Sequence, residues 1–270
     1  MSIDQLQSHY GFTRAPFGRA LPTQALHPHP AHRQAVARIQ WCVAQRQLGV
    51  ITGEVGAGKT VAVRAGLAQI EASRHQVIYI ADPTVGMRGI QSQIVTALGG
   101  TPAFYSGVLA HQTAILLAGE LDERARVPVV VIDEAHLLAN TDLESLRMLT
   151  NIDMDTESHF ALLLVGQPTL RRRLKLAVMS ALDQRISSRV TINGMDLADT
   201  VAYIRHHLAF AGRSDTLFSD DAIAAIHHAS RGYPRAVNNH AISALIATYA
   251  ADKAIVDLAA AQSAITENSE

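Results

Sequence analysis

The sequence predicts an α/β protein in which a five-stranded parallel sheet, flanked by helices, is followed by a small domain made only of helices. Three observations predict this fold. Short apolar runs alternate with segments of helical periodicity over residues 31–193. A glycine-rich loop at residues 53–60 joins the first apolar run to a helix. After Asn193 and Gly194 only helical periodicity remains.

The composition is that of a globular protein with little charge. Of the 270 residues, 48% are hydrophobic and 17% are charged, and the formal net charge is −1. There is no basic field over the whole molecule, so any contact with DNA has to come from a local patch or from an assembly of copies. Cys42 is the single cysteine, which excludes an intramolecular disulfide. No apolar run approaches the roughly 18 residues of a membrane helix, and we expect a cytoplasmic protein without membrane contact.

The N-terminal residues 1–30 are expected to form an extended arm, because prolines and glycines forbid long regular structure there. Phe12 and Phe17 are the residues expected to pin this arm onto the body. We therefore expect three parts: the arm, an α/β domain at residues 31–193 and a helical domain at residues 194–270.

The glycine-rich loop follows the apolar residues 48–52 and precedes a helix, which is the context of a phosphate-binding loop. Its glycines let backbone N–H groups turn inward, and the helix N-terminus adds partial positive charge, so a polyphosphate can be held there. We expect Lys59 to contact the β- and γ-phosphates of ATP, and Thr60 to give its hydroxyl to Mg²⁺. The residues expected to bind the nucleotide at this loop are Gly53, Glu54, Val55, Gly56, Ala57, Gly58, Lys59, Thr60 and Val61.

Two acidic residues follow the third expected strand. The second strand is expected at residues 77–81 and the third, rich in β-branched residues, at 128–132. Asp133 and Glu134 come directly after it, at the carboxyl edge where ligands bind in open α/β sheets. We expect Asp133 to hold the Mg²⁺ shell and Glu134 to orient or deprotonate the attacking water.

Polar residues also follow the fourth expected strand, residues 160–165. Gln167 is placed to sense the γ-phosphate or its water, and the alternative is a simple turn that ends the strand. The basic run at residues 171–175 is either a solvated helix face or a contact with a neighbouring subunit or DNA phosphate. A short fifth strand is expected at residues 190–192.

The last part of the chain is expected to hold four helices with their own start and stop signals. Ser219 and Asp257 can cap the second and the last, and Pro234 stands in the first turn of the third.

These motifs together resemble the AAA+ ATPases. Within that group the chain resembles the ExeA/GspA-type branch, which is similar to transposon-encoded helper ATPases such as TniB and TnsC. The segments that carry the resemblance are Tyr10-Gly11-Phe12, Ala15-Pro16-Phe17, residues 52–60, Ile132-Asp133-Glu134-Ala135-His136-Leu137-Leu138, Gly166-Gln167-Pro168, Asp183-Gln184-Arg185-Ile186 and Gly232-Tyr233-Pro234-Arg235-Ala236-Val237-Asn238.

The resemblance implies a Mg²⁺-dependent ATPase whose site is completed by a neighbouring copy in a ring or helical filament. It implies that Gln167 is sensor 1 and that Arg235, in a helical lid, is sensor 2 and reaches the γ-phosphate. Arg185 or Arg189 would be the arginine finger for the neighbour's site. Which one serves stays open, because Arg185 fits the family position while Arg189 lies closer to the fifth strand.

The resemblance also implies a biological role. Secretion-type members carry a transmembrane helix and a cell-wall-binding domain beyond the lid, and the chain ends at Glu270, so we expect the transposition role. Such helpers assemble with ATP on double-stranded DNA and recruit a DDE-type transposase or integrase, with a target-selector protein as a further partner. Thr84 and Arg88 are the candidate DNA contacts, although Arg88 could equally be an ordinary surface cation. The alternative is a cytoplasmic adaptor that organises secretion machinery without binding DNA.

Overall fold

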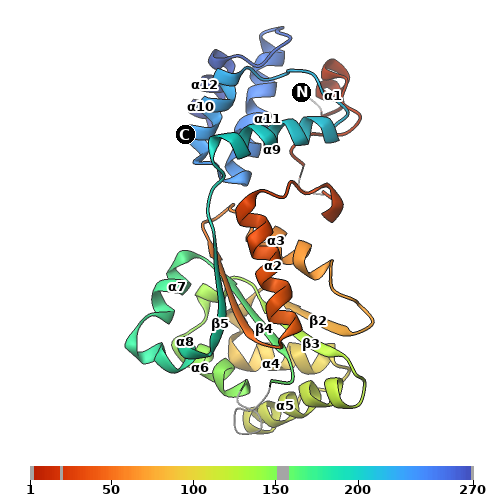
Figure 1. Ribbon diagram of the computed structural model, residues 1–270, viewed down its shortest axis with the longest axis vertical. Coiled ribbons are helices and arrows are strands. Elements are labelled where there is room, and N and C mark those ends of the chain that lie inside the picture. Colours follow the sequence, from red (N-terminus) through yellow and green to blue (C-terminus); the bar gives the residue numbers. More distant parts are fainter. Residues whose placement is uncertain (1–2, 19–20, 151–157, 269–270) are drawn as a thin grey trace. The chain divides into compact units, whose positions relative to one another are not determined.

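The computed structural model describes residues 3–18, 21–150 and 158–268, which form two compact units (Figure 1). An α/β unit contains residues 32–55 and 59–192. A helical unit contains residues 193–270 together with residues 1–31 and 56–58.

The α/β unit is built on one sheet of five parallel strands, which confirms the predicted fold class. The strand order is β2-β3-β4-β1-β5. The strands are β1 (Leu48–Gly53), β2 (His75–Ile80), β3 (Val127–Ile132), β4 (Ala161–Gly166) and β5 (Ile186–Ile192). Because β1 lies between β4 and the edge strand β5, the loop that follows β1 leaves the sheet from an inner strand.

Strand β5 is longer than the sequence predicted. It begins at Ile186, not at residue 190, and its buried and exposed residues alternate over most of its length. It is an edge strand, so only alternate side chains enter the core, and the apolar run that identifies a fully buried strand is missing.

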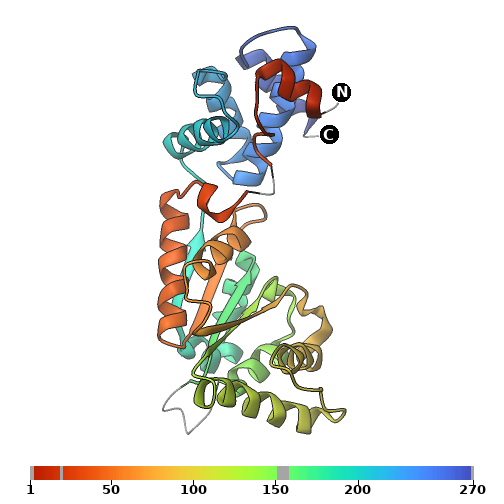
Figure 2. The same ribbon diagram turned by 90° about the vertical axis from the view of Figure 1, so that its right-hand side faces the viewer.

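Helices cover both faces of this sheet (Figure 1, Figure 2). The side chains of Leu48, Val50 and Ile132 belong to a core shared with α4, α6 and α7. Helix α2 packs closely on β1: a Cβ added at Gly49 would lie 2.6 Å from Cys42 Sγ. The helices of this part of the chain are α2 (Pro30–Ala44), α3 (Lys59–Leu67), α4 (Gly86–Ala97), α5 (Ser106–Asp122), α6 (Asn140–Leu149), α7 (Pro168–Leu174) and α8 (Ser180–Arg185), with short 3-10 turns η2 (Pro83–Val85), η3 (Ala135–Leu137) and η5 (Ala177–Met179).

The helical unit has its own apolar core. Its helices are α9 (Leu197–Phe210), α10 (Asp220–Ser230), α11 (Pro234–Ala250) and α12 (Leu258–Glu267), together with α1 (Ile3–Tyr10) and the 3-10 turn η1 (Thr23–Ala25). The Ser219 side chain caps α10 and the Asp257 side chain caps α12, by accepting hydrogen bonds from the N–H groups of Ala222 and Ala260.

The N-terminal segment differs from the extended arm that the sequence predicted, because residues 3–10 form helix α1. The glycines and prolines that break regular structure begin only at Gly11, so nothing prevents a helix before it. Tyr10, Phe12 and Phe17 are buried in the core of the helical unit. The Tyr10 hydroxyl donates a hydrogen bond of 2.9 Å to the Leu245 carbonyl.

Among the helices in the described part of the chain, none is long and apolar enough to cross a membrane.

Candidate functional site

The glycine-rich loop leaves β1 at Gly53 and enters α3 at Lys59. Gly56 and Gly58 have φ angles of 80° and 90°, in the left-handed region where residues with a Cβ are disfavoured. This explains why glycine stands at both positions. The first N–H groups of α3 have no partner within the helix, so the loop ends at a site suited to an anion.

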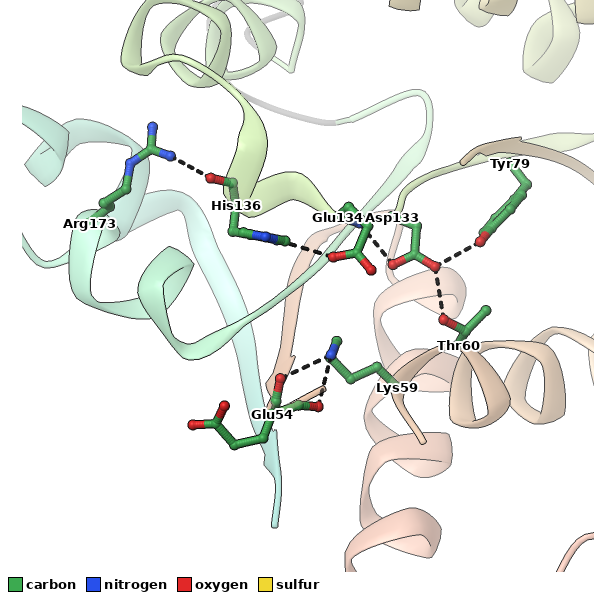
Figure 3. Close-up of polar contacts among 9 residues, drawn as sticks. Glu54, Lys59, Thr60, Tyr79, Asp133, Glu134, His136 and Arg173 are labelled. Carbon is green, nitrogen blue, oxygen red and sulfur yellow. Dashed lines mark hydrogen bonds and ion pairs between the residues drawn. The ribbon is translucent and has the colours of Figure 1, made fainter. Parts of the chain in front are cut away.

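Lys59 lies within this loop and is only 8% exposed. Its ammonium group donates hydrogen bonds to the carbonyls of Gly53 at 3.0 Å and Glu54 at 3.1 Å (Figure 3). The amine is therefore held beside the loop backbone, where a phosphate group could take the place of these carbonyls.

Thr60 and Asp133 bring the loop and the third strand together. The Thr60 hydroxyl donates to Asp133 Oδ2 at 2.9 Å, and the N–H of Glu134 donates to Asp133 Oδ1 at 2.8 Å (Figure 3). Asp133 is 5% exposed. Hydroxyl and carboxylate oxygens are the ligands that Mg²⁺ prefers, so these residues fit the metal expected here. The described residues contain no group of three His, Cys, Asp or Glu side chains that could hold a metal alone, so phosphate oxygens and water would complete its shell.

Tyr79 is a member of the site that the sequence did not identify. Its hydroxyl donates to Asp133 Oδ2 at 2.7 Å. Burial, followed by the hydrogen bond to Asp133 and the negative charges of Asp133 and Glu134, raises the pKa of Tyr79 well above its usual value. The phenol therefore stays protonated and remains a donor to the carboxylate. A tyrosine near the end of β2 reads in the sequence as an ordinary strand residue, so only its place near the carboxyl edge could have suggested a role.

Glu134 and Gln167 lie at the same edge of the sheet. Glu134 has a left-handed backbone, with φ 49°, and its side chain is 45% exposed. Gln167 follows β4, and the preceding Gly166 pairs with Thr52 of β1. In a parallel sheet this register puts Gln167 level with Gly53, where the phosphate loop begins.

The basic run at residues 171–175 is mostly bound within the chain. Arg173 donates to the carbonyls of His136 and Leu138 at 2.8 and 2.6 Å, and to Asn140 Oδ1 at 2.7 Å. Arg171 donates to Thr191 Oγ1 at 3.2 Å, and Lys175 donates to Asp183 at 3.0 Å. Neither alternative for this run, a solvated face or a contact with another molecule, describes Arg173. His136 and Arg173 are further residues near the site that the sequence did not identify.

Of the two finger candidates, Arg185 is not brought to this site within one chain. Arg185 precedes Ile186, which pairs with Leu48 at the amino end of β1, whereas the phosphate loop follows the carboxyl end. At about 3.3 Å per residue, the two ends of β1 are roughly 16 Å apart. Arg185 Nη1 lies 3.4 Å from the carbonyl oxygen and hydroxyl of Thr150.

Arg189 lies further along β5 and pairs with Val50. It donates to Asp183 Oδ1 at 2.9 Å and to the Ile186 carbonyl at 3.1 Å. Burial raises the pKa of Asp183, but the hydrogen bonds and charges of Lys175 and Arg189 outweigh it, and the pKa lies below its usual value.

Arg235, the second residue of α11, contacts the glycine-rich loop. Its backbone N–H donates a hydrogen bond of 3.3 Å to the Gly56 carbonyl, and a Cβ added at Gly56 would lie 2.8 Å from the Arg235 Cβ. The predicted DNA contacts lie elsewhere. Thr84 lies in η2, where its N–H and hydroxyl donate to Asp82 Oδ1 at 2.9 and 2.6 Å. Arg88, on α4, donates to the Phe104 carbonyl at 2.9 Å, and its guanidinium lies 5.4 Å from the centre of the Phe104 ring. Phe104 is 77% exposed, so Arg88 lies beside an exposed aromatic ring, and this ring in turn packs edge-on against the exposed Tyr105, with ring centres 5.4 Å apart.

Comparison with known proteins gives the class of this domain. Residues 43–174 match a family model described as an AAA domain. This match, together with the five-stranded parallel sheet and the phosphate loop, shows that the chain contains an AAA+ domain of the P-loop fold.

A more particular similarity is to General secretion pathway protein A of Aeromonas hydrophila, which is 30% identical over 249 residues. The aligned region is 89% of this chain and 44% of that protein, so the chain spans less than half the length of this relative.

Two solved structures show the same fold. Cdc6p from Pyrobaculum aerophilum gives a TM-score of 0.68 at 17% identity, covering 89% of this chain and 67% of that one. The ORC1 protein of Aeropyrum pernix, solved in complex with DNA, gives a TM-score of 0.66 at 17% identity, covering 92% of this chain and 68% of that one. At these identities the similarity shows the fold alone. The relation to TniB and TnsC stays a prediction.

Proposed function

We propose that the protein is an ATP-hydrolysing switch whose site lies at the carboxyl edge of the sheet. The observation that carries this proposal is the 2.9 Å hydrogen bond from Thr60 to Asp133. It joins the start of α3 to the end of β3, so that a hydroxyl and a carboxylate meet beside the Lys59 amine. This combination suits a triphosphate with its metal.

Each residue then has a distinct role. Lys59 would neutralise charge on the β- and γ-phosphates, and Thr60 and Asp133 would hold Mg²⁺. The metal supplies Lewis acidity to the phosphoryl oxygens when it is bound. Glu134 would orient the attacking water and accept its proton. Gln167, level with the start of the loop, would contact the γ-phosphate.

The experiment that tests this role compares nucleotide binding with and without Mg²⁺ in the parent and in Thr60→Val. Because valine keeps the shape of threonine and loses the hydroxyl, the variant should lose about 10-fold or more of the Mg²⁺-dependent gain in affinity for a fluorescent ATP analogue. Thr96→Val, on the exposed face of α4, is the matched control and should bind as the parent does. If Thr60→Val keeps the full Mg²⁺ dependence, the proposed metal site is wrong.

We infer that hydrolysis needs a second copy of the chain. The support is that Arg185 lies at the amino end of β1, away from the phosphate loop, and that Arg189 is bound to Asp183. An arginine finger supplied by a neighbour is worth about 10³- to 10⁵-fold in rate. Arg235 is proposed to act from the helical unit as sensor 2.

A mixing experiment tests this inference. Glu134→Gln has a defective site but intact arginines, and Arg185→Ala or Arg189→Ala has the reverse. Mixing the two inactive proteins should restore hydrolysis for whichever arginine is the finger, since one copy completes the other's site. If both arginine variants hydrolyse ATP as the parent does, the inference fails.

Two targets of the switch are proposed. The similarity to General secretion pathway protein A favours a protein partner, which the switch would organise without binding DNA. The second candidate is a transposition helper that assembles on double-stranded DNA with a transposase or integrase. The observation that favours it is the exposed Arg88, which lies over the exposed Phe104 ring and offers a cation to the phosphates of a duplex.

Substitution of Arg88 distinguishes the DNA function from the function with a protein partner. With an ATP analogue at low salt, the DNA function predicts that the parent binds duplex DNA, that binding falls steeply with salt, and that Arg88→Glu weakens it. The control is Arg38→Glu, on the exposed face of α2. It changes the net charge by the same amount and should leave DNA binding as in the parent. Absence of DNA binding by the parent would reject the DNA function and leave the protein partner.

A further inference from the structure

The turn that follows β3 is held by a single side chain from another element. Arg173, near the end of α7, donates hydrogen bonds to the carbonyls of His136 and Leu138 and to Asn140 Oδ1. The three acceptors alternate along the chain from the middle of η3 to the first residue of α6. One guanidinium therefore fixes the whole path of the turn, and its planar set of donors is what makes three acceptors possible.

The same turn begins at Glu134, whose backbone is in the left-handed region with φ 49° and ψ 31°. A residue with a Cβ is held there only when its surroundings impose it, and such positions cluster at functional sites. The end of β4 also lies close by, since a Cβ added at Gly166 would be 3.1 Å from the backbone nitrogen of His136. Packing and hydrogen bonds from one segment, residues 166–173, thus hold the residues that directly follow Glu134.

His136 links the turn to the Glu134 carboxylate. Its Nδ1 lies 3.2 Å from Glu134 Oε2, and its side chain is only 13% exposed (Figure 3). This is a close contact and not a regular hydrogen bond, and within the described residues neither atom has a hydrogen-bond partner. These two atoms therefore face each other, and no other described residue takes either of them as a hydrogen-bond partner.

We propose that Arg173 and His136 are positioning residues for Glu134: Arg173 fixes the turn that carries His136, and His136 holds the Glu134 carboxylate towards the site. This inference rests on the ATPase function proposed above. Helix α7 starts directly after Gln167 and ends just after Arg173. At 1.5 Å per residue, Gln167 and Arg173 are about 9 Å apart along the helix axis. The same short helix therefore has the residue expected to contact the γ-phosphate as its N-cap, and it carries the residue that fixes the turn after Glu134.

The test uses Arg173→Ala and Arg173→Lys, with Arg147→Ala as the matched control. Arg147 is also partly buried, but its partners Glu144 and Met148 lie in α6 itself. Three quantities are measured: amide hydrogen exchange of residues 134–140 without nucleotide, affinity for a fluorescent ATP analogue, and kcat with KM for ATP.

For Arg173→Ala we expect faster exchange in residues 134–140, an affinity within about 2-fold of the parent, and a kcat lower by about 10- to 100-fold, because small misplacements of a catalytic group cost this much. For Arg173→Lys the exchange rate and kcat should lie between those of Arg173→Ala and the parent. An ammonium group can still donate hydrogen bonds, but it lacks the planar set of donors of a guanidinium. Equal losses of kcat in Arg147→Ala and Arg173→Ala, or parental exchange in Arg173→Ala, would overturn the role of Arg173.

The positioning role of His136 is tested by the substitutions His136→Ala and His136→Asn. In His136→Asn the amide nitrogen takes the place of Nδ1, so kcat should stay near that of the parent, while His136→Ala should lower kcat with little change in KM. If His136→Ala hydrolyses ATP as the parent does, the role of His136 is wrong. A parent protein that binds ATP but never hydrolyses it would reject the proposed ATPase function, whereas faster exchange in Arg173→Ala would still support the Arg173 contact with the turn.

Discussion

His207 is the basis of a prediction about stability in acid. It lies on α9 with 1% exposure, stacked on Phe17 with ring centres 5.2 Å apart. Burial, followed by repulsion from the neighbouring His206 and His27, lowers the pKa of His207 from 6.5 to about 4. Between these values the unfolded chain binds a proton that the folded helical unit does not accept. The contribution of His207 to the free energy of unfolding is therefore fully present above pH 6.5 and is lost as the pH drops towards 4.

The size of the effect follows from those two values. At pH 5 the imidazole of the unfolded chain is almost fully protonated and that of the folded protein is mostly neutral, so linkage costs about 2 kcal/mol of unfolding free energy relative to pH 7.5. The assay is urea unfolding at both pH values, for the parent, for His207→Leu and for His228→Leu, an exposed control on α10. His207→Leu should lose about 2 kcal/mol less than the parent on going to pH 5, whatever its stability at pH 7.5. An equal acid loss in the parent and in His207→Leu would refute the reasoning.

Three further predictions concern the site and the core. Glu134→Gln should bind ATP as the parent does but turn it over about 10²- to 10⁴-fold more slowly, measured as phosphate release, and parental turnover would reject Glu134 as the base. Asp133→Ala should weaken Mg²⁺-dependent nucleotide binding about 10- to 100-fold, measured by titration with Mg²⁺, and an unchanged Mg²⁺ midpoint would count against its role. Gly49→Ala should cost about 1–3 kcal/mol of stability, because the new Cβ would lie 2.6 Å from Cys42 Sγ, and an unshifted melting temperature would contradict this packing.

Much of the fold could be predicted because the central strands are buried on both faces. Strands β3 and β4 read as continuous apolar runs, because helices cover both faces of the sheet there (Figure 1, Figure 2). The predicted fifth strand lies within β5 but is shorter than β5. Ser187 and Arg189 point out of the core at the sheet edge, so the first half of the strand has no continuous apolar run. Helix α1 was missed because the prolines and glycines that follow it dominated the interpretation of the whole segment.

The candidate site divides in the same way. Lys59 and Thr60 could be identified because the loop motif fixes their spacing, and Asp133 and Glu134 because they end an apolar strand. Arg173 could not, because nothing in the sequence distinguishes it from Arg171 and Arg172. Which arginine meets the turn after β3 depends on the rotation of α7 and on how the helix packs, and neither is encoded locally.

In the proposed function Lys59 contacts the phosphates of a bound ATP. Equilibrium binding of a fluorescent ATP analogue with Mg²⁺ tests this contact, with the parent compared with Lys59→Ala. A charge-assisted hydrogen bond of this kind is worth about 1.5–3 kcal/mol, so the variant should bind about 10- to 100-fold more weakly and should not hydrolyse ATP. A Lys59→Ala protein that binds and hydrolyses ATP as the parent does would contradict the account.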